Sequence, residues 1–148
     1  MIIIDLSQGL AGPFAGALLA ELGAEVIKVE PPGGDPQRQR AAADAEDESF
    51  AWANRRKRSI AIDLRRPAGR DLVLRLAERA DALIESFAPR ALGRMGLSFR
   101  ALRRSNPSIV LTSVTPFGHP APGQKLAEYE LAAAGNQCSH IHRCVHHR

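Results

Sequence analysis

Short apolar runs alternate along the chain with segments in which apolar residues recur at helical spacing. Five runs of strand length predict β-strands at residues 1–4, 25–30, 59–64, 82–85 and 109–114. Segments of helical periodicity predict helices at residues 13–22, 49–54, 67–80, 91–95, 99–105 and 126–134. Strands that alternate with helices are typical of a parallel sheet, so we predict an α/β fold in which helices flank a parallel sheet.

The first 35 residues hold the most informative pattern. A strand leads through a turn at residues 6–12, which contains Gly9 and Gly12, into a helix that we expect to begin at Pro13 and to stop before Gly23. A glycine turn between a strand and a helix can bind an anion, because free N–H groups and the positive end of the helix dipole meet there. A turn that only packs the helix on the strand fits the same spacing equally well.

The spacing of the glycines argues against a dinucleotide fingerprint. Gly9 and Gly12 give the pattern GxxG, whereas the fingerprint is GxGxxG. Glu30 does end the second strand, where an acid that binds a ribose would lie. A nicotinamide site is therefore disfavoured but stays an alternative.

Two polar stretches follow this first unit. Residues 31–48 are rich in proline, glycine and small acidic residues, and we predict a loop there. The basic run Arg55–Arg58 is typical of a solvated face, and no aromatic platform accompanies it. A nucleotide- or nucleic-acid-binding α/β module without catalysis remains the alternative function, although nucleic acid is not the favoured partner.

Composition narrows the class of protein. The 148 residues suit one domain, and 45% of them are hydrophobic. No apolar run approaches the roughly 20 residues that span a bilayer, and the N-terminus lacks the pattern of a signal peptide. We therefore expect a cytoplasmic protein without membrane partners. The 17 arginines against three lysines favour binding of phosphate or carboxylate groups, because guanidinium forks match those anions.

Parallel sheets bind ligands outside the carboxyl ends of their strands. The predicted strand ends place Arg65 and Arg66 after the third strand and Arg94 after the fourth. We expect these arginines to reach one crevice and to suit a phosphorylated ligand. Solvated caps and ion pairs are the alternative role for each of them.

Four blocks of sequence follow one another along the chain: DLSQGLAGPFAGALLAELGAEVIKVEPPGGD, NRRKRSIAIDLRRPAGRDL, ADALIESFAPRALGRMGLSFRALRRSNPSIVLTSVTPFG and AEYELAAA. In this order they resemble the class III CoA-transferases (CaiB/BaiF type), and the resemblance runs from Met1 to about Ala134. This family includes formyl-CoA transferase, the carnitine CoA-transferases and α-methylacyl-CoA racemase.

The resemblance implies a Rossmann-like large domain, a smaller second domain and an interlocked homodimer. It also implies transfer of CoA between carboxylic acids through an aspartyl-CoA thioester, or epimerisation of an acyl-CoA. Coenzyme A and acyl-CoA would then be substrates, and no permanently bound cofactor or metal is expected.

The resemblance also carries site residues onto this chain. The positions that match the CoA contacts of the family are Leu10, Ala11, Ile62, Asp63, Leu64, Arg65, Ser86, Phe87 and Arg94. Glu130 holds an acidic position of the transferases and is the catalytic candidate, although an acid at a helix start is also typical of a cap. Leu10 replaces the catalytic glutamine of formyl-CoA transferase, and Tyr129 stands near the histidine of the racemase. Oxalate or formate specificity and racemisation are therefore disfavoured.

The family's nucleophilic aspartate lies beyond the last matching block. We expect residues 1–134 to be the N-terminal part of the large domain, incomplete as a sheet, and the isolated chain to be inactive because it lacks this nucleophile. Residues 135–148 resemble nothing in the family, and we predict a divergent, disordered tail. The alternative is a zinc site built from Cys138, His140, His142, Cys144, His146 and His147.

Overall fold

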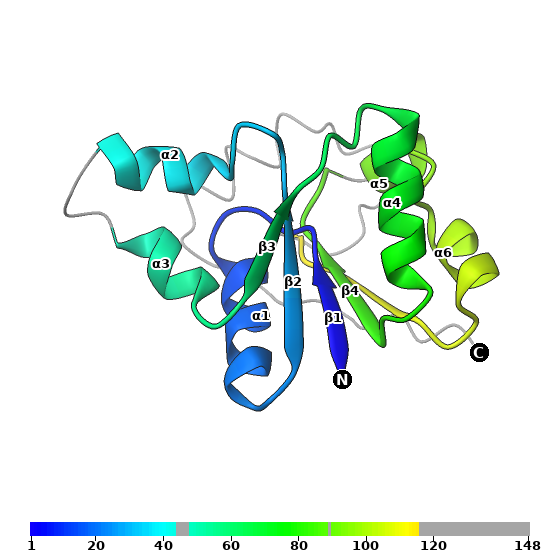
Figure 1. The fold of residues 1–148 in the computed structure, drawn as a ribbon, viewed down its shortest axis with the longest axis horizontal. Coiled ribbons are helices and arrows are strands. Elements are labelled where there is room, and N and C mark those ends of the chain that lie inside the picture. The colour runs from blue at the N-terminus through cyan, green and yellow to red at the C-terminus, as the bar shows by residue number, and fades with distance from the viewer. Residues whose placement is uncertain (44–47, 89, 116–148) are drawn as a thin grey trace.

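The computed structural model describes residues 1–43, 48–88 and 90–115 of the chain (Figure 1). The five strands are β1 Ile2–Asp5, β2 Glu25–Glu30, β3 Arg58–Ala61, β4 Ala82–Glu85 and β5 Val110–Ser113. The helices in these ranges are α1 Ala11–Glu21, α2 Pro36–Ala43, α3 Ser49–Asn54, α4 Pro67–Ala77, α5 Ala91–Arg94 and α6 Phe99–Ser105.

The strands form one parallel sheet in the order β3-β2-β1-β4-β5, which confirms the predicted α/β fold. In the central strand, Ile4 lies opposite Ile27 of β2 and Leu83 of β4. The chain builds outward from β1 to β3 and then returns to place β4 on the other side of β1. The point where the strand order reverses therefore lies between β1 and β4, as in Rossmann-type sheets.

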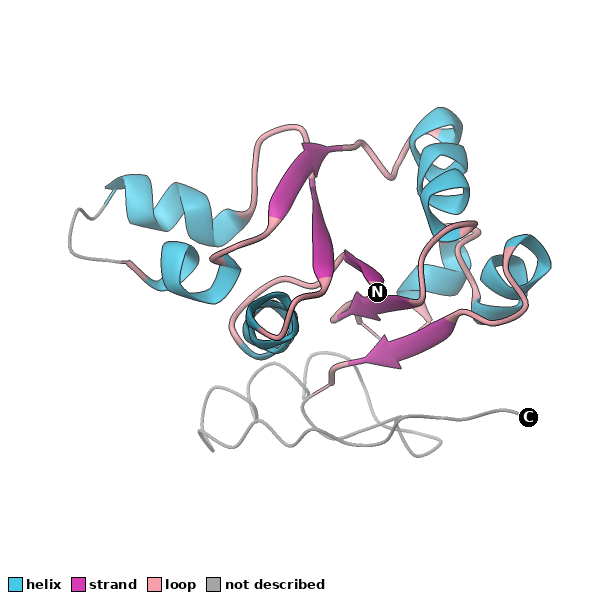
Figure 2. Cartoon of the chain, turned by 60° about the horizontal axis from the view of Figure 1, so that its bottom comes forward, coloured by secondary structure: helices cyan, strands magenta, loops and turns pink. Residues whose placement is uncertain are grey.

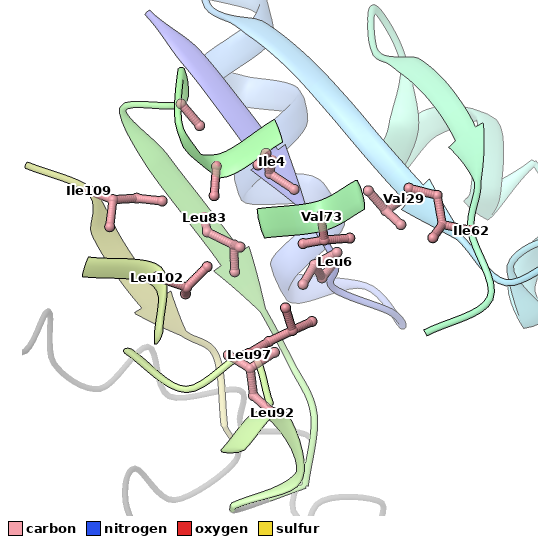
Figure 3. Packing of buried hydrophobic residues seen from close by; sticks show 12 residues of the cluster. Ile4, Leu6, Val29, Ile62, Val73, Leu83, Leu92, Leu97, Leu102 and Ile109 are labelled. Atoms are coloured by element: carbon pink, nitrogen blue, oxygen red, sulfur yellow. The ribbon is translucent and has the colours of Figure 1, made fainter. Parts of the chain in front are cut away.

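Each face of the sheet packs against its own set of helices, as Figure 2 shows. Neighbouring residues of a strand point to opposite faces, so Ile3 belongs to a cluster with Ala20 of α1, while Ile4 joins a larger cluster with Val73 of α4 and Leu102 of α6 (Figure 3). The buried strands read as continuous apolar runs because helices cover both faces.

The first helix begins earlier than its proline suggests. The prediction that Pro13 occupies the first helical position is wrong, because α1 starts at Ala11 and Pro13 is its third residue. A proline is tolerated there since the N–H groups of the whole first turn lack intrahelical acceptors. The stop is confirmed: Gly23 has a φ of 95° and donates to the Ala20 carbonyl, while Ala24 donates to that of Leu19.

The predicted loop at residues 31–48 is wrong in part, because α2 occupies Pro36–Ala43. Asp35 precedes the helix, and its Oδ1 accepts a hydrogen bond from the N–H of Gln37 at 2.8 Å. An acidic residue followed by proline is a helix-start signal that the density of glycine and proline concealed. The third strand is shorter than predicted, since β3 ends at Ala61.

The other predicted elements of the described ranges are confirmed within one to three residues at their ends. Ser98 caps α6 as expected, since its hydroxyl accepts from the N–H of Ala101 at 3.2 Å. The predicted helix at 126–134 and the predicted tail at 135–148 lie outside the described residues.

Two helical glycines offer a matched test of how closely α4 approaches the segment after β3. A Cβ on Gly69 would lie 2.2 Å from the main-chain oxygen of Asp63, whereas a Cβ on Gly93 of α5 would meet no atom within 4 Å. We expect Gly69→Ala to lower the free energy of unfolding by about 1–3 kcal/mol, because backbone cannot move aside as a side chain can. Gly93→Ala should raise it by about 0.4–1 kcal/mol. Urea unfolding of both variants checks this, and equal effects would contradict it.

Candidate functional site

The turn after β1 presents main-chain N–H groups at the carboxyl edge of the sheet. Gly9 has a φ of 77°, which favours glycine, and Leu10 is the N-cap of α1 without a side-chain capping bond. The first N–H groups of α1 have no intrahelical acceptors, and the positive end of its dipole lies at Ala11. A Cβ on Gly12 would lie 2.4 Å from Cβ of Ser7, so this close turn requires glycine there. The arrangement can receive an anion.

Strand β4 supports the same turn from the other side of the switch point. The hydroxyl of Ser86 accepts from the N–H of Gln8 at 2.8 Å and donates to its carbonyl oxygen at 3.0 Å. The N–H of Phe87 donates to Glu85 Oε2 at 2.7 Å, and its ring packs against the larger core cluster. The structure therefore places Ser86 against the turn that leads to Leu10 and Ala11, and Phe87 follows Ser86 in the chain.

The segment after β3 places a second group of predicted residues at this edge. Ile62 is 4% exposed as a whole residue and belongs to the core, and its N–H donates to the carbonyl oxygen of Glu30 at 2.8 Å. The carboxylate of Asp63 accepts from the N–H and the guanidinium of Arg65 at 3.1 and 2.9 Å, and Arg66 lies 3.6 Å away. The side-chain hydrogen bond from Arg65 lowers the pKa of Asp63. Leu64 packs on the core cluster.

The side chains of Arg65 and Arg66 are more than four-fifths exposed despite these contacts. Arg94 is also exposed, and it lies in α5 after β4. Strands β2 and β1 separate β3 from β4, and neighbouring strands lie about 4.8 Å apart. The convergence of the three arginines on one ligand therefore stays a prediction. Glu130 lies outside the described residues.

A buried network of charged side chains beneath the turn was not predicted. The Lys28 ammonium lies 3.0 Å from Asp35 Oδ2 and donates to the carbonyl oxygen of Ser7 at 2.9 Å. The Lys57 ammonium donates to Asp5 Oδ2 at 2.7 Å. Each of the four charged side chains is at most 1% exposed. The available signal was a charge inside an apolar strand, since Lys28 interrupts the run Val26–Val29 and Asp5 ends the run before it.

Further contacts tie this network to neighbouring elements. Lys57 also donates to the carbonyl oxygen of Pro13 at 2.6 Å and to Asn54 Oδ1 at 2.9 Å, which joins α1 to α3. Burial lowers the pKa of Lys57. Glu30 Oε2 accepts from the N–H of Asp35 and from Nε of Arg38, both at 3.0 Å.

The basic run is not a free cationic surface. Within it, Lys57 is buried, Arg58 pairs with Glu25 at 2.6 Å and Arg55 pairs with Glu21. The Arg55 guanidinium also lies over the stacked rings of Phe14 and Trp52. These internal partners weaken the alternative of nucleic-acid binding by this run.

In the described part of the chain, no helix has the length and apolar character that crossing a bilayer requires. The same residues contain no group of three His, Cys, Asp or Glu side chains arranged to hold a metal. The Cys/His-rich segment at 135–148 lies outside them, so the zinc hypothesis stays untested.

Comparison with protein families identifies the family of the chain. Residues 1–139 match the family described as CoA-transferase family III. The chain belongs to CoA-transferase family III. This confirms the resemblance seen in the sequence, and within the family the turn after β1 and the segment after β3 are the regions where the resemblance had placed the CoA contacts.

Individual members of CoA-transferase family III are similar over most of the chain. The succinate–glutarate CoA-transferase of Agrobacterium fabrum is 43% identical over 142 residues, which are 90% of this chain and 36% of that protein. The succinyl-CoA–D-citramalate CoA-transferase of Chloroflexus aurantiacus is 44% identical over 123 residues, 81% of this chain and 31% of that protein. The chain spans about a third of the length of these curated relatives.

The fold agrees with a solved structure of the same kind. A crystal structure of a CaiB/BaiF family protein from Brucella suis superposes with a TM-score of 0.74 at 43% identity. The superposition covers 82% of this chain and 34% of that one. The Rossmann-like sheet is therefore shared with this relative over most of its described length.

The pairing of Arg38 with Glu30 predicts a pH-dependent contribution to stability. The side-chain hydrogen bond from Arg38 lowers the pKa of Glu30. This stabilisation is present above the ordinary pKa of glutamate and is lost as the pH falls through the lowered pKa of the folded state. We expect Arg38→Met to lower the free energy of unfolding by about 0.5–1 kcal/mol at pH 7, since Arg38 is half exposed, and by less at pH 3.

Urea unfolding at the two pH values measures this difference. Arg58→Met is the control, because it breaks a more exposed pair, in which the side chains are 78% and 45% exposed. The control should lose less at pH 7. A loss for Arg38→Met that is equal at both pH values would contradict the assignment to the carboxylate.

Proposed function

We propose that the protein containing this chain transfers CoA between carboxylic acids, and that this chain binds the CoA moiety at the carboxyl edge of its sheet. The observation that carries the proposal is that the chain belongs to a CoA-transferase family and also has anion-binding groups at one edge of its sheet. In a member of CoA-transferase family III, a helix N-terminus after β1 and exposed arginines after β3 lie at the same edge. Coenzyme A is a substrate in this scheme, not a resident cofactor.

The groups at this edge suit the chemistry of CoA. Its phosphates carry negative charge, which favours the positive end of α1 and the guanidinium groups of Arg65 and Arg66. We assign Leu10 and Ala11 to the turn contact, since Leu10 is 53% exposed there. Ile62 would hold the segment after β3 in place from the core, and the ring of Phe87 would offer a partly buried apolar surface.

The other residues that the resemblance singled out complete the proposed site. Asp63, Leu64, Ser86 and Arg94 belong to the proposed CoA contacts, and Glu130 remains the proposed catalytic acid. Asp63 and Ser86 would act through what they hold, because Asp63 binds Arg65 and Ser86 binds Gln8. The proposed location is the cytoplasm, and the proposed assembly is a homodimer.

Dicarboxylic acids are the substrate class that we propose, with succinyl-CoA as the donor. Both relatives described above are named for succinate or succinyl-CoA, paired with glutarate or D-citramalate. In such a reaction the thioester bond of the donor breaks and an equivalent thioester forms on the acceptor acid. No oxidant, reductant or metal is needed for that balance.

The contact assigned to Arg65 predicts a local loss of affinity. We expect Arg65→Ala to raise the dissociation constant for CoA about tenfold, because a charge-assisted hydrogen bond to phosphate contributes about 1.5–3 kcal/mol. Arg58→Ala is the matched control, since Arg58 begins β3 and lies at the opposite edge of the sheet. Calorimetric titration of both variants measures the effect. Equal losses would indicate diffuse charge attraction and not a site.

The family's nucleophilic aspartate is expected beyond the last matching block, which predicts CoA binding without turnover for these 148 residues by themselves. We expect the 148-residue chain to be protected by CoA against thermal unfolding, because a ligand that binds only the folded state stabilises it. The same chain should not exchange labelled CoA between succinyl-CoA and free succinate. Appearance of the label in the thioester would show that these residues catalyse the transfer alone.

The salt dependence of binding distinguishes nucleic-acid binding from the proposed CoA binding. Binding that neutralises several phosphates weakens steeply as salt rises. A DNA or RNA complex with such a slope, together with no thermal protection by CoA, would favour the alternative module.

A further inference from the structure

Ser7, the second residue of the turn, has a hydrogen bond at its N–H, its carbonyl group and its hydroxyl. The N–H of Ser7 donates to Asp5 Oδ1 at 2.9 Å, and its hydroxyl donates to the same oxygen. Its carbonyl oxygen accepts from the Lys28 ammonium at 2.9 Å. Ser7 itself is fully buried. The base of the turn is therefore defined by two charged side chains from β1 and β2.

The ammonium of Lys28 is in turn placed by a segment distant from the turn. Asp35 Oδ2 lies 3.0 Å from it, and Asp35 follows the glycine-rich segment after β2. Asp35 is fixed by two further hydrogen bonds, from its N–H to Glu30 Oε2 at 3.0 Å and from the N–H of Gln37 to its Oδ1 at 2.8 Å. A continuous line of contacts thus runs from the start of α2 through Lys28 to Ser7.

Stability alone does not account for this pair. Moving two charges out of water costs more than most buried ion pairs return, and apolar replacements of both partners are often neutral or stabilising. Lys28 and Asp35 are each 1% exposed, so the full cost applies to them. Unlike an apolar replacement, Lys28 donates a hydrogen bond to the carbonyl oxygen of Ser7.

We propose that Lys28 and Asp35 are positioning residues for the anion-binding turn: Asp35 holds the Lys28 ammonium, and Lys28 orients Ser7 so that the N–H groups from Gly9 onward face the ligand. This inference rests on the proposed function, because it takes the ligand at the turn to be CoA. By linkage, a ligand that orders the turn also orders the segment around Asp35.

A second buried ion pair, between Lys57 and Asp5, holds α1 on β1 independently of Lys28. Lys57 joins Asp5 to the carbonyl oxygen of Pro13, and a Cβ on Gly16 would lie 3.1 Å from Asp5 Oδ2 and 3.2 Å from the ammonium. These contacts anchor α1 to β1 without Lys28. Loss of Lys28 should therefore change the turn and leave the packing of α1 in place.

The test compares Lys28→Met, Asp35→Asn and the double variant in the full 148-residue chain. Each single variant leaves one buried charge without its partner and should lower the free energy of unfolding. The double variant removes both charges and keeps an acceptor for Gln37, so its stability should recover relative to the singles. Its Ser7 carbonyl still lacks the ammonium donor, so its dissociation constant for CoA should stay about fivefold or more above that of the unchanged chain.

Amide hydrogen exchange of residues 7–12 provides a readout that needs no ligand. We expect faster exchange in the double variant than in the unchanged chain, and no change in Glu25→Gln, which breaks an exposed pair at the other end of β2. A double variant with unchanged CoA affinity and unchanged exchange would overturn the inference. If the unchanged chain does not bind CoA, the proposed function fails, and exchange at the turn alone decides the positioning role.

Discussion

The structure depends on burying ions beneath a turn at the centre of its sheet. Lys28 and Asp5 point toward the α1 face of the sheet, and both are fully buried. A buried ion must find a partner of opposite charge, because its desolvation is otherwise too costly. Asp35 and Lys57 meet this demand: Asp35 holds the segment after β2 against Lys28 of β2, and Lys57 holds the segment after α3 against Asp5 of β1. The path of the chain between β2 and β3 follows from that pairing.

The same pairing connects the framework to the candidate site. The order β3-β2-β1-β4-β5 places the reversal of the sheet beside β1, where ligands of such sheets bind. The turn at this point accepts a hydrogen bond from Lys28 and exchanges two with Ser86 across the reversal, while the first turn of α1 accepts one from Lys57. A set of N–H groups binds an anion well only if it is held in place before the ligand arrives, since ordering it afterwards would reduce affinity. The polar interior and the candidate site are therefore parts of one arrangement.

The arginine-rich composition is used in two different ways. Arg38, Arg55 and Arg58 pair with glutamates of β2 and α1 and hold elements together. Arg65 and Arg66 contact Asp63 but remain largely exposed after β3. Both uses were open from the sequence, because a guanidinium group serves either purpose. Burial and neighbouring carboxylates separate them, and these depend on which strands lie side by side.

The sequence by itself determined the class of fold, the order of the strands along the chain and the family. Apolar runs and helical spacing are local signals, and the turn after β1 was evident from Gly9 and Gly12 alone. Local signals misplaced the start of α1 and concealed α2, because glycine and proline mark helix starts as well as loops. Only the tertiary structure decided which charges are buried and what they hold. Asp5 and Lys57 are 52 residues apart in the chain, and Lys28 reaches Ser7 across 21. Such pairs form because parallel strands bring distant residues to one edge, which no periodicity along the chain records.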